Sequence, residues 1–139
     1  MLLLSGCNSK QKTTDIYMYT EDNMPPYVKG LEDIIDTHGE LENKERFNDF
    51  LNNVQQGKAD NIRVVKYTTE GAPIIYDYEF EKDMIKVTID TRRDDYGQKE
   101  IFHTICTSIE MNKATKKTEY ALKGCVPLME NNMILDIEK

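Results

Sequence analysis

The sequence predicts an α+β domain in which one amphipathic helix packs on an antiparallel meander sheet of about five strands. Two observations carry this prediction. Apolar residues recur at helical spacing over residues 44–56, and after Asp60 the apolar period changes to two. The chain has 139 residues, of which 39% are hydrophobic and 31% charged, so it suits one domain with one modest core.

The helix is expected at residues 44–56. Acids and amides cover one side of it, and four apolar residues at three-and-four spacing form the face that should pack on the sheet. This face consists of Phe47, Phe50, Leu51 and Val54. Asn43 is expected to cap the first amide groups, and Gly57 to supply the left-handed residue that ends the helix.

Five strands are expected after the helix, joined by short connections that only antiparallel neighbours allow. They cover residues 62–67, 74–80, 85–89 and 101–109 and a segment after residue 117. On the fourth strand the odd-numbered residues from Ile101 to Ile109 are expected to point inward. This places His103 in the core as a hydrogen-bonded histidine. On the fifth strand, Tyr120 and Leu122 are expected to point inward.

The first seven residues, Met1 to Cys7, are an apolar run that ends in Leu4-Ser5-Gly6-Cys7 and resembles the lipobox of bacterial lipoproteins. Small residues before the cysteine permit cleavage, and a thiol that carries two acyl chains of the palmitate type holds firmly in a bilayer. Only four residues precede Ser5, fewer than a signal peptide needs, so the natural start is expected upstream. The alternative is a cytosolic protein whose N-terminal residues match the lipobox by chance.

A polar segment follows the cysteine. Residues 8–30 show no helical or alternating apolar period, which is typical of a flexible tether, and the single domain is expected over residues 31–139. The tyrosines and methionines at residues 17–27 are too few and too scattered for a thioether copper site. The sequence therefore predicts a truncated signal at 1–7, a tether, and one domain lipid-anchored to the outer face of the cell membrane.

Two cysteines remain if Cys7 is lipidated. Outside the cytoplasm an even pair is expected to bridge, so Cys106 and Cys125 should form a disulfide. An antiparallel register that pairs 106 with 125 also pairs 113 with 118 and leaves Thr115 and Lys116 as a two-residue turn. Strand alternation places both thiols on the face away from the helix. A zinc pair would lack two ligands, and no redox CxxC motif is present.

Several segments together resemble a family of small lipoproteins from spore-forming Gram-positive bacteria whose domain has no known function. They are Gly39-Glu40-Leu41-Glu42-Asn43, Tyr67-Thr68-Thr69-Glu70-Gly71-Ala72-Pro73-Ile74, Asp90-Thr91-Arg92-Arg93-Asp94, Cys106 and Gly124-Cys125. The similarity covers roughly Asp33 to Cys125. It implies a lipoprotein outside the cytoplasm and brings no activity or functional residues with it.

The charge balance and the motifs exclude some functions. With 18 Lys and Arg against 25 Asp and Glu, the net charge is −7, which repels nucleic acid. No nucleophile turn, phosphate loop or two-histidine metal motif is present, so no catalytic residue, metal or cofactor is predicted. Asp90, Asp94 and Asp95 surround Gly97 as in a calcium loop, but the ligand spacing differs, and Arg92 and Arg93 would pair with them.

A binding site is predicted where the first and third turns of the meander meet, because successive turns alternate between the two ends of a sheet. That end, expected to lie near the disulfide, gathers Glu70, Arg92, Arg93, Asp94, Asp95 and Tyr96. Forked guanidinium groups beside an aromatic ring suit recognition. The alternative is that the arginines merely pair with neighbouring acids and pin the loop.

The predicted function is a non-catalytic binding or interaction module for an unknown protein, peptide or wall ligand. The alternative is a small carboxylate- or metal-dependent enzyme that uses the Asp90–Asp95 loop.

Overall fold

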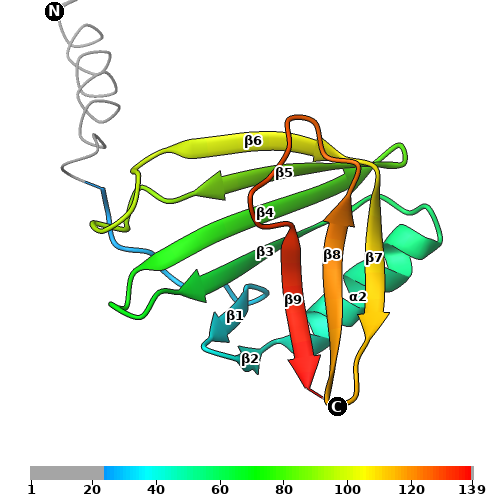
Figure 1. The fold of residues 1–139 in the computed structure, drawn as a ribbon, viewed down its shortest axis with the longest axis horizontal. Coiled ribbons are helices and arrows are strands. Elements are labelled where there is room, and N and C mark those ends of the chain that lie inside the picture. The colour runs from blue at the N-terminus through cyan, green and yellow to red at the C-terminus, as the bar shows by residue number, and fades with distance from the viewer. Residues whose placement is uncertain (1–23, 139) are drawn as a thin grey trace, which may run out of the picture.

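The computed structural model describes residues 24–138 of the chain. The fold is mostly β, with about 50% strand and 10% helix, and it has two sheets rather than one. The prediction of an α+β fold with one helix on a five-stranded meander is therefore wrong. Figure 1 shows why: the last three strands of the chain form a second, smaller sheet that crosses the first.

The first sheet has six strands in the order β2-β1-β3-β4-β5-β6. Their bounds are β1 Ile34–Thr37, β2 Glu40–Glu42, β3 Asp60–Tyr67, β4 Pro73–Glu81, β5 Met84–Asp90 and β6 Ile101–Cys106. Strands β3 to β6 form the antiparallel meander expected from their short connections. Strand β1, which the sequence analysis missed, pairs in parallel with β3, and the long connection between them includes the helix.

The second sheet has three antiparallel strands in the order β7-β8-β9. They are β7 Ser108–Lys113, β8 Lys117–Lys123 and β9 Met133–Glu138. The β7–β8 register pairs Lys113 with Thr118, and the Ala114 N–H donates to the Lys117 carbonyl at 2.8 Å. The predicted hairpin register is thus confirmed, although the hairpin belongs to its own sheet.

The expected fourth strand, residues 101–109, breaks at Thr107, where the chain leaves the first sheet. The Thr107 N–H donates to the Lys123 carbonyl at 2.9 Å, and this bond connects the corner to the end of β8. Gly124 has φ 66°, and a Cβ there would lie 2.2 Å from the Thr107 hydroxyl oxygen. Only glycine fits so close an approach in that conformation, and it allows the two sheets to fold over each other.

Side chains of β6 point opposite to the predicted direction. Thr104 and Cys106 are buried, whereas Ile101, His103 and Ile105 are exposed. The inward residues become odd-numbered only in β7, because the corner at Thr107 shifts the alternation. His103 is therefore not a core residue; its Nδ1 lies 3.2 Å from the Thr88 hydroxyl on the open face.

The helix α2, Lys44–Gln55, agrees with the predicted range to within one residue. Phe47 and Phe50 are fully buried, and Leu51 and Val54 pack against the same core, so the predicted helix face is confirmed. Gly57, with φ 74°, ends the helix as expected.

Asn43 does not cap the helix with its side chain. The backbone of Asn43 is left-handed, at φ 62°. Its side-chain Nδ2 donates to the backbone carbonyls of Leu31 and Asp33 at 3.1 and 2.7 Å. The side chain therefore holds the segment before β1 and cannot reach the first helical amides.

The main core lies between the two sheets and the helix. Phe47 meets Tyr120 of β8 edge-to-face, with ring centroids 5.2 Å apart. Leu122 of β8 and both cysteines are buried in the same cluster. The thiols thus lie on the helix-packed side, contrary to the prediction, because the second sheet folds over that side.

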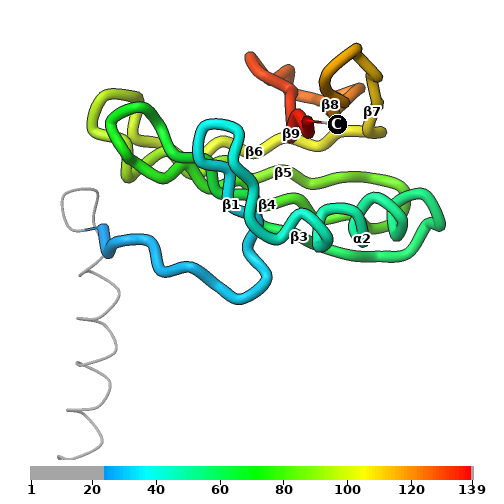
Figure 2. Tube along the Cα trace, turned by 90° about the horizontal axis from the view of Figure 1, so that it is seen from below, coloured from blue at the N-terminus to red at the C-terminus, as the bar shows by residue number. Residues whose placement is uncertain are grey.

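The opposite face of the six-stranded sheet carries a smaller cluster, Ile35, Val65 and Ile75. Tyr27 and Tyr67 pack against it, and Figure 2 shows the N-terminal segment passing under this face. Residues 24–30, part of the expected tether, thus contact the domain, while Cys7 and the rest of that tether lie outside the described residues.

Candidate functional site

A pocket of about 590 Å³ lies at one end of the six-stranded sheet, where three segments far apart in sequence meet. The N-terminal segment, the β3–β4 turn and the β5–β6 loop each contribute to it. We call it the tyrosine pocket. Its lining consists of Met24, Pro25, Pro26, Tyr27, Tyr67, Glu70, Gly71, Ala72, Pro73, Arg92, Arg93, Asp95, Tyr96 and Lys99.

The tyrosine pocket includes five of the six residues proposed from the sequence. These are Glu70, Arg92, Arg93, Asp95 and Tyr96. The first and third turns of the meander therefore meet as expected. Asp94 does not line the pocket; its carboxylate accepts the Tyr96 N–H at 3.0 Å and so shapes the loop.

The predicted proximity of this site to the disulfide is wrong. The sulfur atoms of Cys106 and Cys125 are 2.03 Å apart, but Cys106 pairs with Ile85 near the β4–β5 turn. The β5–β6 loop lies at the other end of β6, where Asp90 pairs with Ile101. The prediction failed because it continued one flat meander past Thr107.

The two arginines of the site share one carboxylate. Arg92 donates to both Asp90 oxygens at 3.0 Å, and an Arg93 nitrogen lies 3.4 Å from one of them. Burial raises the pKa of Asp90, but the hydrogen bonds and charge of Arg92, together with Arg93, outweigh this, so that the pKa lies below its usual range. Arg92 and Arg93 therefore converge on the Asp90 carboxylate at this wall of the pocket.

The N-terminal segment forms another wall and is held in place by two contacts. Arg93 Nε donates to the Pro25 carbonyl at 3.0 Å, and the Tyr27 hydroxyl donates to Asp33 at 2.5 Å. Burial and the bond to Asp33 raise the pKa of Tyr27, so the phenol stays protonated. This wall is not apparent from the sequence, because residues up to 30 have the polar, aperiodic composition of a tether; Pro25-Pro26-Tyr27 was the available signal.

Tyr96 projects from the rim of the tyrosine pocket and is 80% exposed. Lys99, which also lines the pocket, pairs with Asp95 at 2.9 Å. The pocket thus combines aromatic and proline walls with cationic groups. Such a surface offers apolar contact and directional hydrogen bonds at once, as binding sites do.

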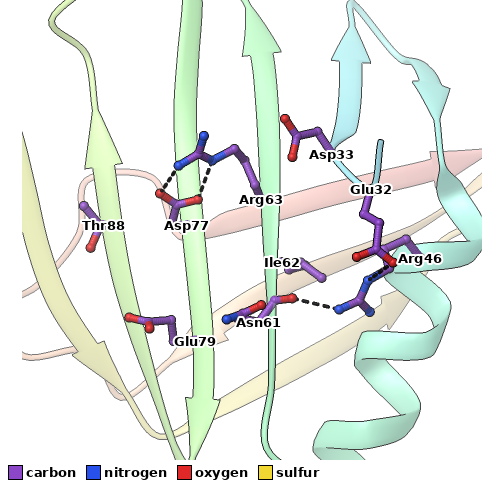
Figure 3. A pocket seen from close by; sticks show the side chains of 9 residues that line it. All are labelled: Glu32, Asp33, Arg46, Asn61, Ile62, Arg63, Asp77, Glu79 and Thr88. Atoms are coloured by element: carbon purple, nitrogen blue, oxygen red, sulfur yellow. Dashed lines mark hydrogen bonds and ion pairs between the residues drawn. The ribbon is translucent and has the colours of Figure 1, made fainter. Parts of the chain in front are cut away.

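A second pocket, of about 410 Å³, lies between the helix, the segment before β1 and the sheet face (Figure 3). Arg63 on β3 donates to Asp77 on β4 at 2.8 and 3.0 Å. Arg46 on α2 donates to the Asn61 carbonyl at 2.8 Å and lies 2.6 Å from Asp60. The ion pairs at this pocket join α2 to β3 and β3 to β4. Its arginines are therefore engaged with acids of the same domain.

The aspartates of the predicted loop are each engaged. Asp90 bonds Arg92, Asp95 bonds Lys99, and Asp94 accepts a backbone N–H. Across residues 24–138, the structure gathers no group of three or more His, Cys, Asp or Glu that could hold a metal ion. Nor does this stretch contain a helix of the length and apolarity required to cross a membrane.

Residues 31–121 match the family model described as "Domain of unknown function (DUF4362)". The match includes the β3–β4 turn and the β5–β6 loop of the tyrosine pocket. No curated protein and no solved structure matches the chain.

Proposed function

The chain belongs to the DUF4362 family of domains of unknown function, and from this premise we propose that it is a non-catalytic binding module, lipid-anchored outside the cytoplasm, whose ligand occupies the tyrosine pocket. The ligand is a peptide, a wall component or another protein. The observation that carries the proposal is the convergence of three distant segments around one pocket with an exposed tyrosine at its rim.

The ionisable groups at the pocket favour binding over catalysis. A general acid at neutral pH needs a carboxyl whose pKa is raised. The pKa of Asp90 is instead lowered by its arginines, and Asp95 is paired with Lys99. These contacts therefore do not support the alternative function, a carboxylate-dependent enzyme that uses the Asp90–Asp95 loop.

The membrane anchor is the second part of the proposal. It rests on Leu4-Ser5-Gly6-Cys7 and on the resemblance to lipoproteins of spore-forming Gram-positive bacteria. Met24 follows Cys7 by 17 residues, and a chain of that length reaches at most about 60 Å. An anchor at Cys7 would therefore keep the tyrosine pocket, which Met24 lines, within that distance of the bilayer.

Replacing Cys7 with alanine should release the protein from the membrane, since two acyl chains are then lost. The measurement is fractionation of cells that express the gene with its native upstream start, followed by immunoblotting. Cys7→Ser serves as a second variant. Equal membrane retention of the wild type and both variants would contradict the anchor.

Replacing Tyr96 with alanine should reduce capture of a cross-linked partner from intact cells at least tenfold, because an exposed aromatic ring at a pocket rim is a typical binding hot spot. Leu128→Ala is the matched control: Leu128 is 87% exposed but lies outside the tyrosine pocket. Both variants should keep the wild-type melting temperature. Capture that survives Tyr96→Ala, or falls equally with Leu128→Ala, would place binding elsewhere.

A further inference from the structure

A groove of about 610 Å³ runs between helix α2 and the second sheet, away from the tyrosine pocket. We call it the α2–β7 groove. Its lining consists of Asn48, Leu51, Asn52, Val54, Gln55, Ile109, Met111 and Tyr120. None of these residues is charged, although 31% of the chain is. The groove is therefore an uncharged strip on a strongly charged protein.

One wall of the groove is the free edge of a sheet. Strand β7 is the outermost strand of the order β7-β8-β9, so within the described residues no strand pairs with it on the far side from β8. The Ala114 N–H bonds the Lys117 carbonyl at 2.8 Å, which makes that pair a hydrogen-bonded one. Alternation along an antiparallel ladder then directs the N–H and C=O groups of Ile109 and Met111 away from β8, to the free edge.

The other wall is a row of amide side chains on the helix. Asn48, Asn52 and Gln55 follow one another at helical spacing along the face that borders the groove. All three are exposed, and their side chains have no hydrogen-bond partner within residues 24–138. They can donate to and accept from the outer backbone edge of a strand that lies beside β7.

We propose that an extended segment of a partner protein adds as a strand to the β7 edge, seated in the α2–β7 groove. Its backbone pairs with Ile109 and Met111, and its uncharged, apolar side chains contact Leu51, Val54 and Met111. Strand addition obtains affinity from main-chain hydrogen bonds and selectivity from the pockets beneath alternate side chains. A charged side chain would be desolvated in this lining without an opposite charge to meet it.

Charge decides between a strand of another protein and a second copy of the chain. The lining of the groove is uncharged and offers no opposite charge to a partner. A second copy would carry the same net charge of −7, which disfavours self-association. The occupant is therefore a strand of a different protein.

The test uses a phage-displayed library of random seven-residue peptides as probe. Panned against the full chain, it should enrich peptides that lack charged residues and carry apolar residues at alternate positions. A synthetic peptide of the enriched sequence should slow hydrogen exchange at the amides of Ile109 and Met111. No enrichment, enrichment of charged peptides, or protection at other amides only would overturn the proposal.

Variants of Met111 separate backbone pairing from side-chain contact. Met111→Pro removes the outward N–H, which an edge strand tolerates, and should weaken binding of the synthetic peptide at least tenfold. Met111→Ala keeps the N–H and should weaken it less. Glu110→Ala, on the opposite face of β7, should leave it unchanged. Equal binding of the peptide by Met111→Pro and the wild type would contradict the proposal. So would a dimer of the wild type that Met111→Pro abolishes. If Met111→Pro does not fold, the hydrogen-exchange result for the wild type decides the question.

Discussion

Replacing Phe50 with alanine should lower the free energy of unfolding by about 3–5 kcal/mol, because it leaves a cavity where a large side chain was fully enclosed. Phe50 has 0% exposure and lies in the core between the helix and both sheets. The loss is a large part of the total stability of a domain of this size. Urea titration followed by circular dichroism measures this loss. The m-value, which is the dependence of the free energy of unfolding on urea concentration, is expected to stay the same.

Asn52→Ala is the matched control for Phe50→Ala. The two positions are two residues apart in α2, but the Asn52 side chain is exposed and has no partner within residues 24–138. Its replacement should change the free energy of unfolding by less than about 0.5 kcal/mol. Equal losses from the two variants would show that the helix face is assigned wrongly.

Loss of the Cys106–Cys125 disulfide should cost about 3 kcal/mol in the chain-entropy model, since the bridge closes a loop with a sequence separation of 19. The bond also joins the end of β6 in the first sheet to the segment that follows β8 in the second. The double variant Cys106→Ala/Cys125→Ala should therefore melt about 10 °C below the wild type.

Thiol labelling checks the same bond directly. Protein taken from outside the cytoplasm and denatured without reductant should show neither Cys106 nor Cys125 reactive, and reductant should expose both. Stoichiometric labelling of both before reduction would show that the bridge is absent, as would wild-type stability of the double alanine variant.

Local patterns predicted much of the fold. The three-and-four spacing of Phe47, Phe50 and Val54 placed the helix and its buried face. Alternation and short turns located β3, β4 and β5, and the pairing of Lys113 with Thr118 followed from the spacing of the two cysteines.

The sequence could not show where the chain changes sheets. Thr107 lies within an apparently continuous alternation from Ile101 to Ile109, and the corner depends on its contact with Gly124, 17 residues later. Strands β1, β2 and β9 were missed because they depend on pairing with distant segments. Ile34 and Ile35 of β1 pair with β3, and Leu135 of β9 pairs with Tyr120 of β8. The apolar runs of β1 and β9 were the only available signal.

The candidate site was predictable in part for the same reason. Glu70 and Tyr96 came together because turn alternation within β3 to β6 is a local rule, and that part of the meander exists. The wall formed by Pro25 and Tyr27 depends on contacts between distant segments: Tyr27 packs on the open face of the six-stranded sheet, and Arg93 binds the Pro25 carbonyl. The α2–β7 groove required the second sheet.

Site-specific photo-cross-linking in intact cells tests the binding function most directly. A photoreactive phenylalanine analogue at position 96, at the rim of the tyrosine pocket, should give a discrete adduct on irradiation, and the same group at position 128, equally exposed elsewhere, should give none. An adduct from position 128 alone, or no adduct from either position, would contradict a ligand in the tyrosine pocket.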